Sequence, residues 1–246
     1  MTDQNAIALM DRFWSSFHAL PEAIGKPGVH VGLRPPGGQP CILLLERGYS
    51  TLVSGPSGLV AWLCESIPEM PDPLTAASWS TIPGHQVDRI IGPAYLGFLG
   101  RNELRPEDYC HETRILTKSD HPAIDGLRKA CDPVEWEHGG MDDDHVFLRT
   151  GAFCGGQLAA AGSCQKRTDH LADIGIVTHP SFRRQGYGTA AAAKAAQKVT
   201  NQGFLPFWRT LLTNKASLRT ARRLGFVDYA LTLSVRLTGD DPCASL

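Results

Sequence analysis

Residues 173–189, the most informative stretch of the sequence, read Asp-Ile-Gly-Ile-Val-Thr-His-Pro-Ser-Phe-Arg-Arg-Gln-Gly-Tyr-Gly-Thr. An apolar strand is predicted at its start, and a helix is predicted to begin at its glycines. The first amides of a helix lack intrahelical partners and lie at the positive end of its dipole, so they attract phosphates. Arg183 and Arg184 add positive charge, and Gly186 and Gly188 let a ligand approach the backbone closely. The stretch therefore predicts a phosphate-binding turn.

Two other phosphate-binding folds fit this turn less well. A dinucleotide-binding fold requires Gly-x-Gly-x-x-Gly, and Ala191 stands where the third glycine is needed. A P-loop requires Gly-Lys-Ser/Thr, and that sequence is absent. A glycine turn with two arginines also fits an ordinary solvated surface turn, so a second motif is needed to decide its role.

The second motif lies at residues 214–226, which read Asn-Lys-Ala-Ser-Leu-Arg-Thr-Ala-Arg-Arg-Leu-Gly-Phe. The Arg-x-x-Gly-x-Gly of residues 183–188 resembles the acyl-CoA diphosphate loop of the GNAT superfamily of N-acetyltransferases. The Asn-x-x-Ser and Leu-Gly-Phe of the second stretch resemble the next motif of the same superfamily, in the expected order. The resemblance covers about residues 111–237. It is closest to the subgroup in which a degenerate GNAT-like half precedes the working half.

The resemblance implies that acetyl-CoA is the cofactor and identifies the residues that hold it. Its pantetheine arm is expected to pair with the main chain of three residues, Ile176, Val177 and Thr178. Its diphosphate is expected to bind the amides of Arg183, Arg184, Gln185, Gly186, Tyr187, Gly188 and Thr189. Asn214 is expected to bind near the thioester, with Ser217 supporting it. Asn before a helix is also a good N-cap, and Ser217 could equally help to cap the helix.

Acetyl transfer needs a neutral amine, stabilisation of an oxyanion and a proton for the departing thiolate. GNAT enzymes often supply that proton from a tyrosine four residues before the glycine of the second motif, where this chain has Ala221, so the general acid is unassigned. Asp173 is the candidate base, because some family members carry a glutamate on this strand. A strand-edge carboxylate in water is the equal alternative. Glu135 is a second candidate catalytic residue.

The short helix predicted at residues 133–137 forms a wall of the acceptor pocket in this superfamily. Glu135 and Glu137 flank Trp136, and two carboxylates around an aromatic ring suit a cationic amine, although an exposed charged helix explains them nearly as well. Trp208, on a later strand, is a further candidate contact with the acceptor. The aspartates at 142–144 lack the spacing of a calcium loop, so no metal is predicted.

Composition restricts the class of protein. The formal net charge of the 246 residues is -1, which excludes the general basic field that drives non-specific nucleic-acid binding. The seven cysteines show no C-x-x-C spacing, which favours a reducing, cytoplasmic setting. No apolar run approaches the roughly 18 residues of a membrane span, and no signal peptide is recognisable. A monomer or a homodimer without membrane contact is expected.

Apolar periodicity and turn residues predict the order of the elements. In the first half they predict a helix at 6–20, a Pro- and Gly-rich loop at 25–40, a hairpin at 41–53, a helix at 57–66, strands at 87–91 and 94–99, and a boundary near 100–110. In the second half they predict strands at 113–116, 146–149, 157–164, 171–177, 205–213 and 226–237, with helices at 121–130, 133–137, 186–200 and 216–224, and a frayed tail.

This order predicts an α/β (α+β) fold: a GNAT-type mixed, mostly antiparallel sheet flanked by helices, preceded by a smaller α/β domain. The predicted domains are 1–108, which could be a degenerate GNAT-like half, and 109–246, the GNAT acetyltransferase domain. The predicted function is acetyl-CoA-dependent N-acetylation of a primary amine in a small molecule or of an exposed amino group. Two alternatives stay open: a catalytically silent acyl-CoA-binding regulatory module, favoured by Ala221, and a dinucleotide-binding oxidoreductase half-domain.

Overall fold

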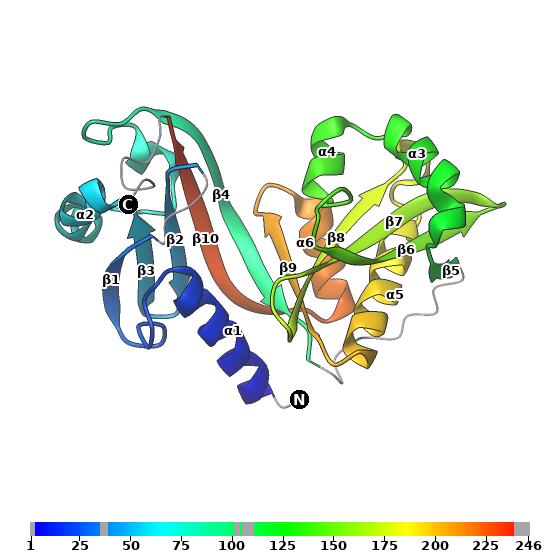
Figure 1. The fold of residues 1–246 in the computed structure, drawn as a ribbon, viewed down its shortest axis with the longest axis horizontal. Coiled ribbons are helices and arrows are strands. Elements are labelled where there is room, and N and C mark those ends of the chain that lie inside the picture. Colours follow the sequence, from blue (N-terminus) through cyan, green and yellow to red (C-terminus); the bar gives the residue numbers. More distant parts are fainter. Residues whose placement is uncertain (1–2, 35–38, 101–103, 105–110, 239–246) are drawn as a thin grey trace. The chain divides into compact units, whose positions relative to one another are not determined.

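The structure is a computed structural model that describes residues 3–34, 39–100, 104 and 111–238 (Figure 1). Residues 35–38 of the loop predicted at 25–40, most of the predicted boundary at 100–110 and the predicted tail lie outside the described residues. Ten strands form a mixed, mostly antiparallel sheet with flanking helices, which confirms the predicted fold class. No helix of the described chain is long and apolar enough to cross a membrane.

The chain forms two compact units, each built from more than one segment. Unit 1 contains Gly97–Arg209 and Ala216–Val227. Unit 2 contains Asp3–Leu96, Thr210–Lys215 and Asp228–Leu246. Each unit has its own strands and helices. The predicted domains, 1–108 and 109–246, stay a prediction.

Unit 2 has the strand order β1-β3-β2-β10-β4. Its elements are α1 (Asp3–Phe17), β1 (Gly28–Leu33), β2 (Cys41–Arg47), β3 (Ser50–Gly55), α2 (Val60–Ser66), β4 (Val87–Phe98) and β10 (Val227–Leu237), with short 3-10 turns at Ser57–Leu59, Ile67–Glu69 and Ala76–Trp79. On one face of the sheet Ile42, Leu44 and Val53 pack with Leu63 of α2 and Trp79. Strand residues alternate between faces, so Ser54 lies on the opposite face, where its hydroxyl contacts His18 just after α1.

Two predictions for unit 2 were wrong. The loop predicted at residues 25–40 contains β1, which pairs in parallel with β3 along all six of its residues, Gly28–Leu33. This pairing partner lies some 20 residues further along the chain, so the local glycines and prolines obscured the strand. The two strands predicted at 87–91 and 94–99 are one strand, β4, which runs through Gly92-Pro93.

Unit 1 has the strand order β5-β6-β7-β8-β9. Its elements are β5 (Glu112–Ile115), α3 (His121–Ala130), α4 (Pro133–His138), β6 (Val146–Cys154), β7 (Gln157–Lys166), β8 (Leu171–Thr178), α5 (Tyr187–Asn201), β9 (Leu205–Leu211) and α6 (Lys215–Leu224). The predicted types and order of these elements are confirmed. The strand predicted at 146–149 is longer than expected, because β6 continues through Gly151 to Cys154.

Helix α5 lies close against β6, β7 and β8 because the facing side chains are small. Its buried residues include six alanines, at positions 190–193, 195 and 196. The Thr150 hydroxyl on β6 donates to the Ala191 carbonyl at 2.8 Å. On β7, a Cβ at Gly162 would lie 3.3 Å from the same carbonyl oxygen, so little room is left between helix and sheet. This packing fixes the first turn of α5 beside the end of β8.

Candidate functional site

Strand β8 has one fully paired edge and one partly open edge. On the first side, β7 pairs with it in antiparallel fashion along Ala172–Thr178. On the second side, β9 pairs with it in parallel only along Leu171–Asp173, opposite Leu205–Phe207. In the described part of the chain no pair joins β8 to β9 beyond Asp173. The rest of β8, residues 174–178, therefore has no strand partner on that side.

The backbone groups on this open edge follow from the alternation of the strand. The N–H of His179 donates to the Ala159 carbonyl beside β7, at 2.9 Å. Because successive residues direct their peptide groups to opposite sides, the N–H and C=O of Val177 also face β7. Those of Ile176 and Thr178 face the open edge. Of the three residues predicted to pair with pantetheine, two therefore direct their backbone to this edge; the contact itself stays a prediction.

The turn between β8 and α5 contains two left-handed residues, Arg184 with φ 61° and Gly186 with φ 89°. This conformation costs a side-chain-bearing residue free energy, a cost that Arg184 bears and that glycine avoids at position 186. A Cβ there would also lie 3.1 Å from His111 Nε2. At Gly188 a Cβ would lie 2.6 Å from Thr178 Oγ1, so this glycine lets the helix begin directly against β8.

The first helical hydrogen bond of α5 runs from the Ala190 N–H to the Gly186 carbonyl, at 2.9 Å. The N–H groups of Tyr187, Gly188 and Thr189 therefore precede the bonds that the helix makes with itself. They lie at the positive end of the helix dipole. The predicted diphosphate residues thus come together in one turn at the end of β8.

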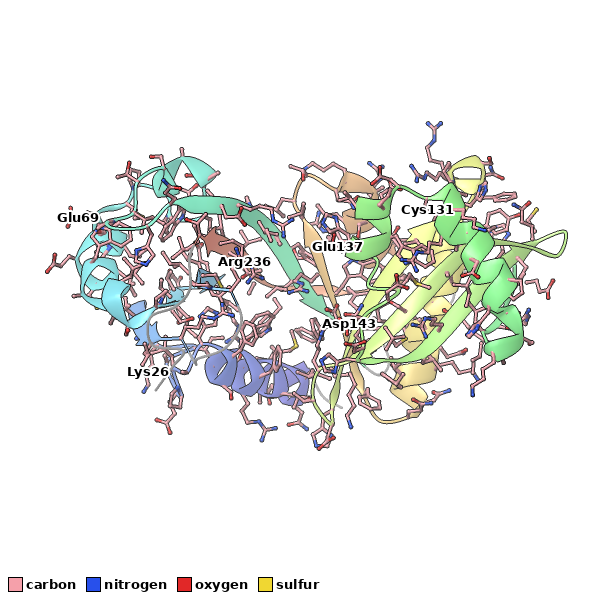
Figure 2. The ribbon with its side chains drawn as sticks, turned by 45° about the horizontal axis from the view of Figure 1, so that its top comes forward. Lys26, Glu69, Cys131, Glu137, Asp143 and Arg236 are labelled. Carbon is pink, nitrogen blue, oxygen red and sulfur yellow. The ribbon has the colours of Figure 1, made fainter. Side chains whose placement is uncertain are left out.

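Arg183 begins this turn and is held by two acceptors. Its Nη2 lies 2.6 Å from Glu135 Oε2, and its Nε donates to the Thr178 carbonyl at 3.3 Å. The same carbonyl accepts a long contact, 3.8 Å, from the thiol of Cys131, which Figure 2 labels next to α3. Burial raises the pKa of this thiol. Glu135, predicted to be catalytic, is therefore the ion-pair partner of the loop arginine.

His111 contacts this turn, and the sequence did not predict that contact. Its Nε2 lies 2.8 Å from the Gln185 carbonyl, and its ring stacks on Tyr187 with centroids 3.9 Å apart. Because a carbonyl oxygen only accepts, Nε2 carries the proton. The Tyr187 ring also packs edge-on against Phe182, at 5.5 Å. No local signal could find His111, since 74 residues separate it from Gln185.

Asp173 lies in the last residue pair between β8 and β9. Its side chain is 9% exposed, with Arg167 Nη2 at 3.5 Å and Arg209 Nη2 at 3.8 Å. Arg167 also reaches Asp143, at 3.3 Å, in the loop after α4 (Figure 2). Burial raises the pKa of the Asp173 carboxyl, and the two arginines oppose that rise. The alternative of a strand-edge carboxylate in water was wrong, because the group is buried and paired.

Two of the three predicted acceptor contacts lie in the core of unit 1. Trp136 is 4% exposed, and its indole N–H donates to Asp142 at 2.9 Å. Trp208 is 2% exposed, and its indole N–H donates to the Ser217 hydroxyl at 3.0 Å. Both side chains are buried and their indole N–H groups are already hydrogen-bonded, which argues against the predicted contacts with an acceptor. Glu137 is exposed on α4 (Figure 2), and its role stays a prediction.

Two residues of the second motif, Ser217 and Ala221, help to hold α6 in place, which the sequence did not predict. Ser217 accepts the Trp208 hydrogen bond and so ties α6 to β9. Ala221 is fully buried, and its carbonyl accepts the Phe226 N–H at 3.0 Å, so this position belongs to the core. Asn214 stands immediately before α6, in the segment that belongs to unit 2, and its predicted cofactor contact is untested.

The residues of unit 1 thus offer a long ligand two kinds of contact. The open edge of β8 offers peptide groups to amides of a ligand lying along it. The turn offers helix N–H groups and the Arg183 guanidinium to an anion at the end of that ligand. The site has glycines where a side chain would fill the turn.

Sequence comparison agrees with this geometry. Residues 111–226 match the Acetyltransferase (GNAT) family. This part of the chain is therefore similar to the GNAT family. The matched residues begin at His111 and end at Phe226, so they include the open edge of β8, the turn and α6. The degenerate N-terminal half predicted for this chain stays a prediction.

Solved structures with a similar GNAT fold share less than a quarter of their residues with this chain. A GNAT-family protein from Novosphingobium aromaticivorans is 23% identical with a TM-score of 0.48, over 63% of this chain and 69% of that one. Aminoglycoside N-acetyltransferase AAC(6')-Iy in complex with CoA is 23% identical with a TM-score of 0.38, over 48% and 92%. The ribosomal-protein-S18-alanine N-acetyltransferase from Escherichia coli is 16% identical with a TM-score of 0.38, over 52% and 95%. No curated protein matches the chain at a significant level.

Proposed function

We propose that the protein is an acetyl-CoA-dependent N-acetyltransferase that acetylates a primary amine of a small molecule or an exposed amino group. One observation carries the proposal: the open edge of β8 leads directly into a left-handed, arginine-bearing turn at the N-terminus of α5. Pantetheine contains amides that suit a free strand edge, and its diphosphate suits the helix N-terminus. The GNAT family of residues 111–226 supports the same function.

In this proposal the open edge of β8 would hold the pantetheine arm. Ile176 would bind pantetheine amides through its backbone N–H and C=O, and Thr178 through its N–H, because the Thr178 carbonyl already accepts from Arg183. The amides of residues 184–189 and the Arg183 guanidinium bind the diphosphate. Bound acetyl-CoA supplies the activated thioester. The strand between Thr178 and Asp173 is about 17 Å long, at about 3.3 Å per residue, so it would carry the arm toward Asp173.

Asp173 is the proposed base. It stands where β8 and β9 part, and its raised pKa makes it a stronger base than an ordinary aspartate. The Asp173 carboxylate would accept the proton that the acceptor amine loses, while acetyl-CoA would supply the acetyl group and leave as free CoA. Ala221 is in the core and offers no proton donor, so the proton of the CoA thiol would come from solvent. Glu135 is not the proposed base, because it lies beside the turn, on Arg183, and not where β8 and β9 part.

Two measurements test the proposal. Calorimetric titration with CoA is expected to show binding, and incubation with acetyl-CoA and a panel of amines is expected to release free thiol. Asp173→Asn is expected to keep the CoA affinity and to lower the turnover rate at pH 7 about 10²- to 10⁴-fold. Asp169→Asn is the matched control, because its carboxylate is 82% exposed and pairs with nearby Lys166.

The possible results separate the alternatives. Binding without thiol release from any amine would favour the silent acyl-CoA-binding module. Thermal stabilisation by NAD(P) and not by CoA would favour the oxidoreductase half-domain. A chain that neither binds CoA nor gains thermal stability from it would overturn the proposal.

A further inference from the structure

The ion pair between Glu135 and Arg183 joins two segments that the sequence keeps 48 residues apart. Glu135 lies in the first turn of α4, where Asp132 caps the helix by accepting from the Val134 N–H at 2.8 Å. At the other end of α4, a Cβ on Gly139 would lie 2.4 Å from Val177 Cγ1, so the helix lies directly against β8. The Glu135 carboxylate is therefore carried by a helix that is fixed at both ends.

Arg183 is oriented by this carboxylate and by the backbone. Its Nε and Nη2 donate to Thr178 and Glu135, and both acceptors lie beside the end of β8. A guanidinium has five N–H donors in one plane, so the two bonds from Nε and Nη2 fix that plane and leave donors for an anion. Without those two acceptors, a long side chain on an exposed turn has many rotamers.

We infer that Glu135 is a positioning residue, which holds the Arg183 guanidinium ready for the diphosphate of the cofactor. This inference rests on the proposed function. The two side chains are 48% and 43% exposed, so their ion pair contributes little to the stability of the fold. Fixing the arginine before the ligand arrives lowers the entropy cost of binding, and the gain is in CoA affinity.

An opposite effect has to be separated from this one. The negative charge of Glu135 also repels a diphosphate, so a carboxylate that merely competed for Arg183 would weaken CoA binding. Glu135→Gln removes the charge but keeps an oxygen that accepts from Arg183, whereas Glu135→Ala removes both. The two substitutions therefore distinguish a positioning carboxylate from a competing one.

Calorimetric titration with CoA tests the inference. Glu135→Ala is expected to weaken binding about fivefold, whereas Glu135→Gln is expected to stay within about twofold of the wild type. In an Arg183→Gln background, Glu135→Ala is expected to have no further effect, because the side chain it positions is gone. Asp125→Ala on α3 is the matched control, since it removes an exposed acid from the same unit.

Each result has one meaning. Tighter CoA binding by both Glu135 variants, or unchanged binding by Glu135→Ala, would overturn the positioning role. The same fivefold loss in the Arg183→Gln background would also overturn it, because Glu135 would then act without the arginine. If the wild-type protein itself binds no CoA, the proposed function fails instead, and the two failures are distinguishable in one set of titrations.

Discussion

Each unit of the molecule has a strand that lies between one antiparallel and one parallel neighbour. The two strands differ in how many of their residues pair with the parallel neighbour. In unit 2, β3 lies between β2 and β1, and β1 follows it along all six residues of the pair. In unit 1, β8 lies between β7 and β9, and β9 pairs with only three of its eight residues. The open edge of β8, rather than the strand itself, distinguishes the candidate site.

The turns that follow these two strands differ in charge and in backbone conformation. After β3 the chain enters the 3-10 turn Ser57–Leu59 and then α2, and no residue from 56 to 66 is basic or has a positive φ. After β8 the turn carries Arg183 and Arg184, with left-handed backbone at Arg184 and Gly186. Both units have a strand, a turn and a helix in succession, but the turn is neutral in unit 2 and cationic in unit 1.

The largest expected effect comes from breaking the turn of unit 1. Gly186→Glu forces a side chain into left-handed backbone, 3.1 Å from His111 at its Cβ, and places a negative charge at the proposed diphosphate. We expect CoA affinity to fall on the order of a thousandfold, through strain and charge repulsion at the helix N-terminus. Calorimetric titration measures the loss.

The matched control is Gly58→Glu in the turn of unit 2. A Cβ at Gly58 meets no atom within 4 Å, so this variant is expected to fold and to bind CoA as the wild type does. Circular dichroism of both variants shows whether they are folded. A folded Gly186→Glu protein with wild-type affinity would remove the turn from the cofactor site.

The second effect is the pH dependence of stability, which differs between the buried ionisable groups of the two units. In unit 2, His18 is fully buried, and burial, followed by the charge of Arg34, lowers its pKa to about 4. An unfolded histidine has a pKa of about 6.5, so the unfolded chain takes up the proton first, and the free energy of unfolding falls as the pH drops from 6.5 to 4. The full loss is about 3 kcal/mol, at about 1.4 kcal/mol per pKa unit.

Urea denaturation at pH 7 and pH 4.5 measures this dependence, and His18→Gln is expected to reduce it, because the glutamine takes up no proton. Asp173 in unit 1 has the opposite sign: its raised pKa lowers stability as the pH rises above about 3.9. The comparison of wild type with His18→Gln isolates the histidine. The same pH dependence in both proteins would show that His18 does not carry it.

The sequence predicted the parts of the site that are local. The turn of residues 183–188 and the helix after it depend on glycines, arginines and alanines that are neighbours in the chain, and the structure has that helix where it was predicted. β1 was missed because its partner is distant, and because its own glycines and the prolines on either side of it resemble a loop. The burial of Trp136 was not predicted, because a six-residue helix with glutamates on both sides of the tryptophan does not indicate which of its faces is buried.

The rest of the site depends on distances in the fold that no local pattern encodes. The open edge of β8 exists because β9 stops pairing after Phe207, and nothing in either strand's own sequence indicates where the two part. The contact of His111 with Gln185 and the ion pair of Glu135 with Arg183 need the sheet and α4 to be in place first. The sequence predicted a catalytic role for Glu135, whereas the structure pairs Glu135 with Arg183.

The smallest effect concerns how closely each helix approaches its strand. In unit 1 a Cβ at Gly188 would lie 2.6 Å from Thr178 Oγ1, on a β-branched side chain with few rotamers. In unit 2 a Cβ at Gly55 would lie 2.8 Å from Leu63 Cδ1, the end of a more flexible side chain. We expect Gly188→Ala to lower the free energy of unfolding by about 2 kcal/mol and Gly55→Ala by less than about 1 kcal/mol.

Urea denaturation of the two variants measures the difference, and Thr178→Ala is the partner substitution that explains it. Removing Oγ1 makes room for the new methyl group, so the double variant Gly188→Ala, Thr178→Ala is expected to cost less than the sum of its single substitutions. Equal costs at Gly188 and Gly55, or strict additivity with Thr178, would mean that α5 can move away from β8. The first-turn amides would then not be held at the end of the open edge, and close packing would no longer explain why unit 1 alone has the site.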